Sequence, residues 1–183
     1  SFLQSCSPNA VIFTHGDNDT YPLWYVQSKG FRNDVHVVNI SLLNTEWYFE
    51  LVQQEASNMK QKNLFSFKKE DFYNDQLDFA YVMSEEDTVF NLSDFSSYLR
   101  NEENNIEFNS SSYPALPSNT LEFIVKRPDS VFFDIDDAEI ETVLKWEIQS
   151  RYLMRSDLLI LDMIENNFDN RPIYFAVTNS SST

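Results

Sequence analysis

Residues 10–19 read AVIFTHGDND and place a short β-branched and aromatic run directly before a polar loop. Such a run predicts a buried strand. A helix is expected after the loop, because Asp19 or Thr20 can cap it and Pro22 is tolerated in its first turn. Gly30 should end that helix. The stretch therefore predicts a strand–loop–helix unit.

The same pattern recurs once downstream, and a helix and a last strand are predicted near the C-terminus. Residues 35–40 (VHVVNI) predict a second strand, and residues 45–56 the helix that follows it. Residues 158–166 predict a further helix and residues 171–177 (RPIYFAV) a last strand. Because strands joined through helices run parallel, we expect an α/β, Rossmann-like fold with an open, mainly parallel sheet flanked by helices.

The middle of the chain departs from this pattern. We expect one α/β domain over residues 1–183, with a core of residues 1–62 and 131–178 and an inserted mixed α+β segment of about residues 63–130. The predicted elements of the middle are a strand at 76–83, a helix at 93–100, an exposed loop at 101–118 and an antiparallel pair of 121–126 with 131–135. Asp136 and Asp137 are expected to open a helix with Ile140, Val143, Leu144 and Ile148 on one side.

The composition excludes several classes of function. The chain has 13 Lys and Arg against 29 Asp and Glu, a net charge of −16, yet 42% of its residues are hydrophobic. It should therefore fold, and its acidic surface should repel nucleic acid and anionic lipid. One Cys and two His leave no disulfide framework and no zinc motif.

No stretch of the sequence predicts a membrane span. The most apolar one, residues 158–164, is short and contains Asp162. The start of the chain also lacks the basic and then apolar pattern of a signal peptide. We expect either an intracellular protein or a soluble piece of a longer one.

The candidate site lies in the loops that follow the first two predicted strands. These loops carry His15, Asp17, Asn18, Asp19 and Asn44, and the carboxyl ends of parallel neighbours meet at one sheet edge. The two aspartates offer ligands for a divalent cation, the two asparagines can bind hydroxyl groups, and the histidine could act as a base. Two glycines are too few for a phosphate cradle, so we expect no cofactor, with a divalent cation as the alternative. The alternative is that the loop only forms the turn and caps the helix.

Aromatic residues gather on the two helices that follow these loops. They are Tyr21, Trp24, Tyr25, Trp47, Tyr48 and Phe49. Rings beside carboxylates and amides are typical of sugar recognition, although their helical spacing also favours a place in the core.

Several strings resemble a known family. They are residues 6–14, 16–25, 32–47, 159–162 and 170–176. In these strings the chain resembles the soluble C-terminal part of DUF2723, a family of Bacteroidetes membrane proteins. The resemblance implies an N-terminal transmembrane region of the same polypeptide, similar to glycosyltransferases, that is missing here. It also implies an extracytoplasmic, periplasmic domain tethered to the inner membrane, and it carries over no catalytic residue.

Three hypotheses for the function follow. The first is an accessory domain of a membrane glycosyltransferase-like protein that binds or positions a glycan or protein acceptor near Asp17, Asp19 and Asn44. The second is a metal-dependent transferase or hydrolase centred on the loop of residues 17–19. The third is a purely structural interaction module.

Overall fold

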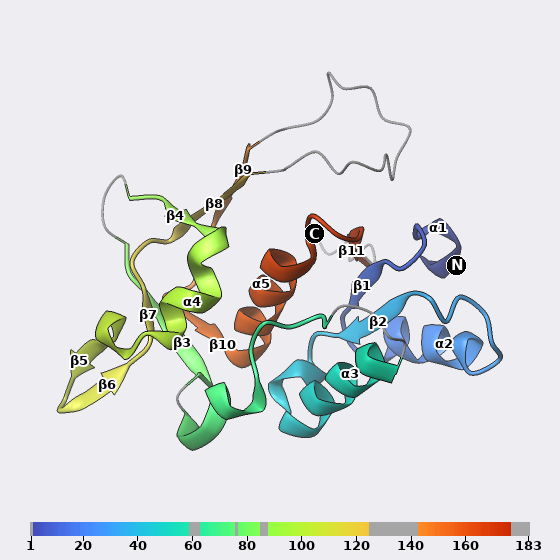
Figure 1. Ribbon diagram of the computed structural model, residues 1–183, viewed down its shortest axis with the longest axis horizontal. Coiled ribbons are helices and arrows are strands. Elements are labelled where there is room, and N and C mark those ends of the chain that lie inside the picture. The colour runs from blue at the N-terminus through green and yellow to red at the C-terminus, as the bar shows by residue number, and fades with distance from the viewer. Residues whose placement is uncertain (1, 59–62, 76, 85–87, 125–142, 177–183) are drawn as a thin grey trace, which may run out of the picture.

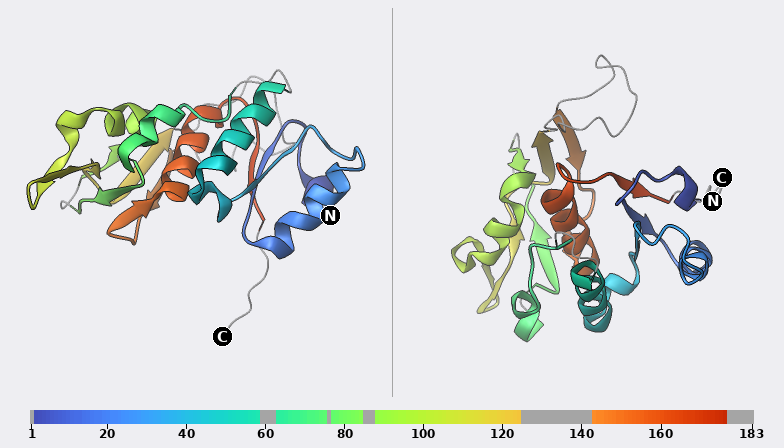
Figure 2. Two further views of the ribbon diagram at one scale, coloured as in Figure 1. Left: turned by 90° about the horizontal axis from the view of Figure 1, so that it is seen from below. Right: turned by 45° about the vertical axis from the view of Figure 1, so that its right-hand side comes forward.

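The computed structural model describes residues 2–58, 63–75, 77–84, 88–124 and 143–176 (Figure 1). Helix α5 (Arg155–Asn167) runs through the middle of the molecule, with one group of elements on either side, as Figure 2 shows. Its residues from Leu158 to Ile164 are all buried. A helix that is apolar on nearly all sides belongs in a core, and α5 accordingly joins the two groups.

The first group is built around a sheet of three parallel strands. Their order is β11 (Ile173–Phe175), β1 (Val11–Thr14) and β2 (His36–Asn39). One face is covered by α1 (Phe2–Ser5) and α2 (Asp17–Gln27), and the other by the 3₁₀ helix η1 (Leu42–Asn44), α3 (Glu46–Asn58) and α5. Alternation along β1 explains both layers, because Val11 and Phe13 face the larger core while Ile12 faces Leu3 and Leu23.

The second group holds three small sheets of mixed orientation. In the first, β3 (Phe79–Val82) pairs antiparallel with β10 (Tyr152–Met154) and parallel with β7 (Ala115–Leu116). In the second, β8 (Thr120–Ile124) pairs parallel with β4 (Phe90–Asn91) and antiparallel with β9 (Val143–Glu147). The third is the hairpin of β5 (Ile106–Phe108) and β6 (Ser111–Tyr113). The helices of this group are η2 (Lys69–Asp75), η3 (Leu92–Asp94), α4 (Phe95–Arg100) and η4 (Glu102–Asn104).

The prediction of a Rossmann-like, mainly parallel sheet is wrong. The described residues form four sheets of only two or three strands, and three of these sheets contain antiparallel pairs. The parallel pairing of β1 with β2 does occur, but side chains occupy the outer edge of β2. There Tyr48 accepts a hydrogen bond from the N–H of Asn39, and Trp24 donates one to the carbonyl of Val37. A covered edge cannot pair with a further strand.

Two other predicted elements are also corrected. Residues 143–147 form strand β9 and not a helix, because Val143 lies opposite Ile124 and Trp146 opposite Leu121 in the pair with β8. The predicted partner strand 131–135 and the start of the predicted helix fall outside the described residues. The loop expected over 101–118 contains the exposed hairpin and also β7, which is buried.

Candidate functional site

The loop after β1 lies at the carboxyl end of the sheet, as predicted. Its residues do not cap α2 in the way that the sequence suggested. Helix α2 begins at Asp17 after Gly16, so neither Asp19 nor Thr20 caps it and Pro22 lies inside it. The hydroxyl of Thr20 is instead the centre of a buried cluster, 2.7 Å from Thr14 Oγ1 and 2.9 Å from Asn39 Nδ2. This cluster ties the end of β1 to the end of β2.

The two predicted acidic ligands differ in exposure. Asp17 and Asn18 are exposed, as is His15, whereas only 7% of Asp19 is exposed. The negative charge of Asp17 and its hydrogen bond raise the pKa of Tyr21. In the described part of the chain, no group of three or more His, Cys, Asp or Glu side chains could hold a metal ion. The geometry therefore gives the cation hypothesis no support within these residues.

Asn44 is the last residue of η1 and contacts the start of α5. Its Oδ1 accepts a hydrogen bond from the N–H of Ser156 at 3.0 Å. Ser156 lies in the first turn of α5, where backbone N–H groups have no partner inside the helix. Asn44 thus stabilises the start of α5.

A groove lies along the outer edge of β2, between α2 and α3. We call it the β2-edge groove, and its volume is about 360 Å³. It is lined by Trp24, Gln27, Asn33, Val35, His36, Val37 and Glu55. A concave site with one large ring and a few polar side chains is typical of small-ligand binding.

Helices α2 and α3 form the groove because they cover opposite faces of the sheet and meet beyond its edge strand. The rings of Trp24 and Tyr48 are 6.1 Å apart across this edge. Gln27 donates to the carbonyls of Val35 at 2.7 Å and Arg32 at 3.0 Å. Gln27 thus satisfies backbone carbonyls of the segment that leads into β2 and also fixes the wall of the groove.

A row of aromatic rings continues from the groove, with an exposed ring at each of its two ends. The aromatic row comprises Tyr21, Trp24, Tyr48 and Trp47, with successive centroids 5.8, 6.1 and 5.5 Å apart. Tyr48 is buried, but 53% of Tyr21 and 57% of Trp47 are exposed. The predicted aromatic cluster is thus divided, with Phe49 in the core and these two rings at the surface.

Burial raises the pKa of two groups at the groove, Tyr48 and Glu55. Desolvation raises the pKa of Tyr48 to about 12, with a further contribution from the charge of Glu55. Tyr48 is therefore protonated at neutral pH and can donate to Val37. Glu55 remains exposed along part of its length, yet partial desolvation raises the pKa of its carboxyl.

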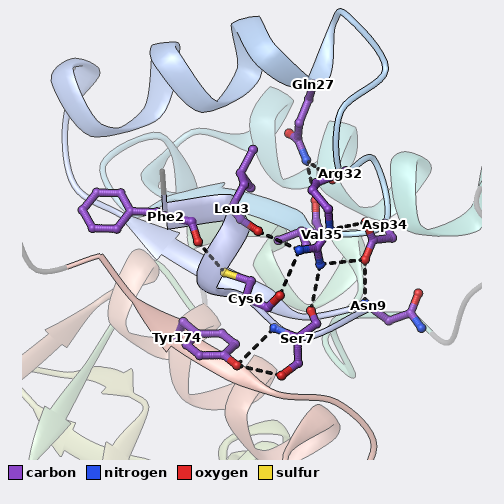
Figure 3. Close-up of polar contacts among 10 residues, drawn as sticks. All are labelled: Phe2, Leu3, Cys6, Ser7, Asn9, Gln27, Arg32, Asp34, Val35 and Tyr174. Carbon is purple, nitrogen blue, oxygen red and sulfur yellow. Dashed lines mark hydrogen bonds and ion pairs between the residues drawn. The ribbon is translucent and has the colours of Figure 1, made fainter.

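Arg32 holds the loop between α2 and β2, and Figure 3 shows its polar contacts. Arg32 pairs with Asp34, which raises the pKa of Arg32 and lowers that of Asp34 to about 2. The guanidinium also donates to the carbonyls of Leu3, Cys6 and Ser7 at 2.7, 2.9 and 3.1 Å. Asn33, between Arg32 and Asp34 in the chain, is therefore anchored on both sides.

The family model of TMEM260-associated domain 2 matches residues 1–183. The chain belongs to this family. The resemblance to DUF2723 is therefore wrong, and nothing supports a Bacteroidetes source or a glycosyltransferase-like parent. As a TMEM260-associated domain, the chain is an accessory domain of a membrane protein. Comparison with the curated proteins and with the solved structures finds no match.

The TMEM260-associated domain contains no helix, among its described residues, with the length and hydrophobicity to cross a bilayer. Of the residues that line its groove, the sequence singled out only Trp24. Gln27, Asn33, His36 and Glu55 were missed because they come from separate elements. One signal was present, since Trp47, Leu51 and Glu55 follow at four-residue steps and form an exposed stripe on α3.

Proposed function

We propose that this accessory domain binds a glycan in the β2-edge groove, with the sugar stacked on Trp24. The observation that carries the proposal is the groove itself, in which an indole, two amides and a carboxyl group line one concavity of about 360 Å³. None of the five loop residues predicted from the sequence lines this groove. The proposed site therefore moves from the end of the sheet to its edge.

The residues of the groove match the chemistry of a sugar. The apolar C–H face of a pyranose ring packs on an aromatic face through dispersion and weak C–H contacts. Its hydroxyl groups both donate and accept, so they need partners such as Asn33 and Glu55. Tyr21 and Trp47 would extend the contact to a second sugar unit, because both are exposed beside Trp24 and Tyr48.

The test is a glycan array followed by calorimetric titration of the best glycan against single variants. Asn33→Ala and Glu55→Gln remove groups that line the groove without touching the core. Each should weaken binding about five- to tenfold, since a lost hydrogen bond is worth about 1 kcal/mol. The control is Gln54→Ala, an exposed neighbour on α3 that does not line the groove, and it should bind as the wild type does.

Three results would contradict the proposal. The first is an array without any binder, and the second is a pair of groove variants that bind as tightly as the wild type. The third is tight capture of a protein by the aromatic row with no affinity for sugars. That outcome would assign the same surface to protein docking, which exposed Tyr and Trp side chains also favour.

The proposed setting is the extracytoplasmic side of a membrane, with the domain linked to a membrane-spanning region of the same polypeptide. The family description supports the link to a membrane protein. The net charge of −16 would keep the domain from lying on an anionic leaflet. Protease added to intact cells that express the full-length protein should cleave this domain, and protection until the cells are lysed would contradict the orientation.

A further inference from the structure

A second cavity lies at the C-terminal end of α5, where that helix meets α4, η3 and the end of β8. We call it the α5-end pocket, and its volume is about 370 Å³. It shares no lining residue with the β2-edge groove. An argument about its ligand is therefore independent of the proposed glycan site.

The pocket is rich in acceptor groups and negative in charge. Glu165, Asp169 and Asn170 line it from the end of α5 and the turn that follows. The last carbonyls of a helix add the negative end of its dipole. A wall of this kind favours a ligand that is positively charged and donates hydrogen bonds.

Among the described residues, the charges near Glu165 leave this negative potential in place. Arg100 is a cation near Glu165, but its guanidinium pairs with Asp71 at 3.2 Å and lies 4.9 Å from the ring centroid of Phe67. Asp94 adds a further negative charge near Glu165. Burial raises the pKa of Glu165, although the N–H of Ser96 donates to it at 3.2 Å. The positive charge of a bound ligand would offset the cost that desolvation adds to the ionised form of Glu165.

Two aromatic rings complete the pocket. Phe123 and Phe168 both line it and meet edge to face, with centroids 5.3 Å apart. The face of a phenyl ring attracts ammonium and guanidinium groups. The chain shows this contact within itself, because Arg100 over Phe67 and Arg155 over Phe72 lie at 4.9 and 5.0 Å from the ring centroids.

We propose that the α5-end pocket binds the ammonium or guanidinium group of a basic side chain on a protein partner. The acceptors at the end of α5 bind the N–H groups, and Phe123 and Phe168 pack against the charged head and its aliphatic stem. The net charge of −16 attracts such a partner over a distance set by the ionic strength. The domain would thereby carry two sites, one for a glycan and one for a basic protein segment.

The experiment is an NMR titration of the whole chain with small probes. N-acetyl-lysine methylamide and N-acetyl-arginine methylamide should shift the amide resonances of residues 165–170 saturably, and added salt should weaken the effect. The neutral isostere N-acetyl-norleucine methylamide should leave these resonances unchanged. Binding of the neutral probe at equal strength, or no saturable shift with either cation, would overturn the proposal.

Two variants with a matched control locate the charge. Glu165→Gln keeps an acceptor for the N–H of Ser96, and Asp169→Asn changes an exposed side chain, so both should fold. Each should weaken binding of the arginine probe at least threefold. Glu103→Gln makes the same change of net charge at an exposed position outside the pocket and should have no effect. Equal weakening by all three variants would show a general charge effect and reject the site.

Discussion

Arg32 and Asp34 form a two-point ion pair, in which Nε donates to Oδ1 at 2.8 Å and Nη2 donates to Oδ2 at 3.0 Å. The same guanidinium donates to three backbone carbonyls of the N-terminal segment. Asp34 also accepts from the N–H of Asn9 at 3.1 Å. One side chain therefore attaches α1 and the entry to β1 to the loop that carries Asn33.

Arg32→Lys should lower the free energy of unfolding by about 2 kcal/mol. A lysine keeps the charge but has no planar fork, so it cannot hold Asp34 and the carbonyls of residues 3–7 together. Urea unfolding measures the change. The control is Arg151→Lys at an exposed position, which should change stability by less than about 0.5 kcal/mol. Equal effects of the two variants would contradict the role of Arg32.

Asp162 should make the domain less stable as the pH rises from about 4 to about 7. Burial raises its pKa to about 7, although Ser66 and Phe67 donate hydrogen bonds to it. The folded state thus retains a proton that the unfolded state loses near pH 4, so the slope of stability with pH is negative, up to about 1.4 kcal/mol per unit. Asp162→Asn should remove most of this slope in urea titrations from pH 4 to 8, and the raised pKa values of Glu55 and Glu165 should leave a smaller slope of the same sign. A wild-type slope that persists in the variant would exclude Asp162 as its source.

Asn44→Ala should destabilise the protein by about 1 kcal/mol and leave glycan affinity unchanged. The substitution removes the acceptor of the Ser156 N–H at the start of α5 and touches no residue of the β2-edge groove. Asn44→Asp keeps the acceptor and should be nearly neutral. Thermal unfolding measures the stability and calorimetric titration measures the glycan affinity. A loss of affinity at constant stability would contradict the prediction and indicate that Asn44 binds the ligand.

Tyr48→Phe should lower the free energy of unfolding by about 1–3 kcal/mol. The hydroxyl accepts from Asn39 N–H at 2.9 Å and lies 3.5 Å from the carbonyl oxygen of Val37, so its removal leaves two groups of β2 without this partner. The uncovered edge should also promote dimers, which sedimentation at increasing concentration would detect. Tyr152→Phe, at an exposed ring, is the control and should change neither quantity.

Local patterns predicted the pieces of this fold better than their assembly. Residues 11–14 form a strand and residues 155–167 form a helix. Both were predictable because the hydrophobic pattern that decides each element lies within the segment itself. Trp24 and Tyr48 prevent a further strand from adding to β2, because both contact the carbonyl of Val37. These contacts depend on how α2 and α3 pack, which no local pattern predicts. Val143 and Leu144 fit a helical stripe as well as a strand, and pairing with β8 selected the strand.

The candidate site was less predictable for the same reason. Asn44 resembled a ligand because it follows a strand, but its partner Ser156 lies 112 residues further along the chain. The groove takes Gln27 from α2, Asn33 from a loop and Glu55 from α3, and no short stretch contains that combination. Trp24 was visible as an aromatic residue, but its exposure beside β2 came only from tertiary packing.

The strand order β11-β1-β2 also bears on how the chain folds during synthesis. Val11 pairs with His36 on one side and with Ile173 on the other, so the central strand gains its second neighbour from a segment far along the sequence. Until that segment leaves the ribosome, β1 presents a row of unsatisfied amides and carbonyls to other nascent chains. Contacts this distant in sequence slow folding, so the interval of exposure is long. Truncation before Ile173 should consequently yield a chain that depends on chaperones to avoid aggregation.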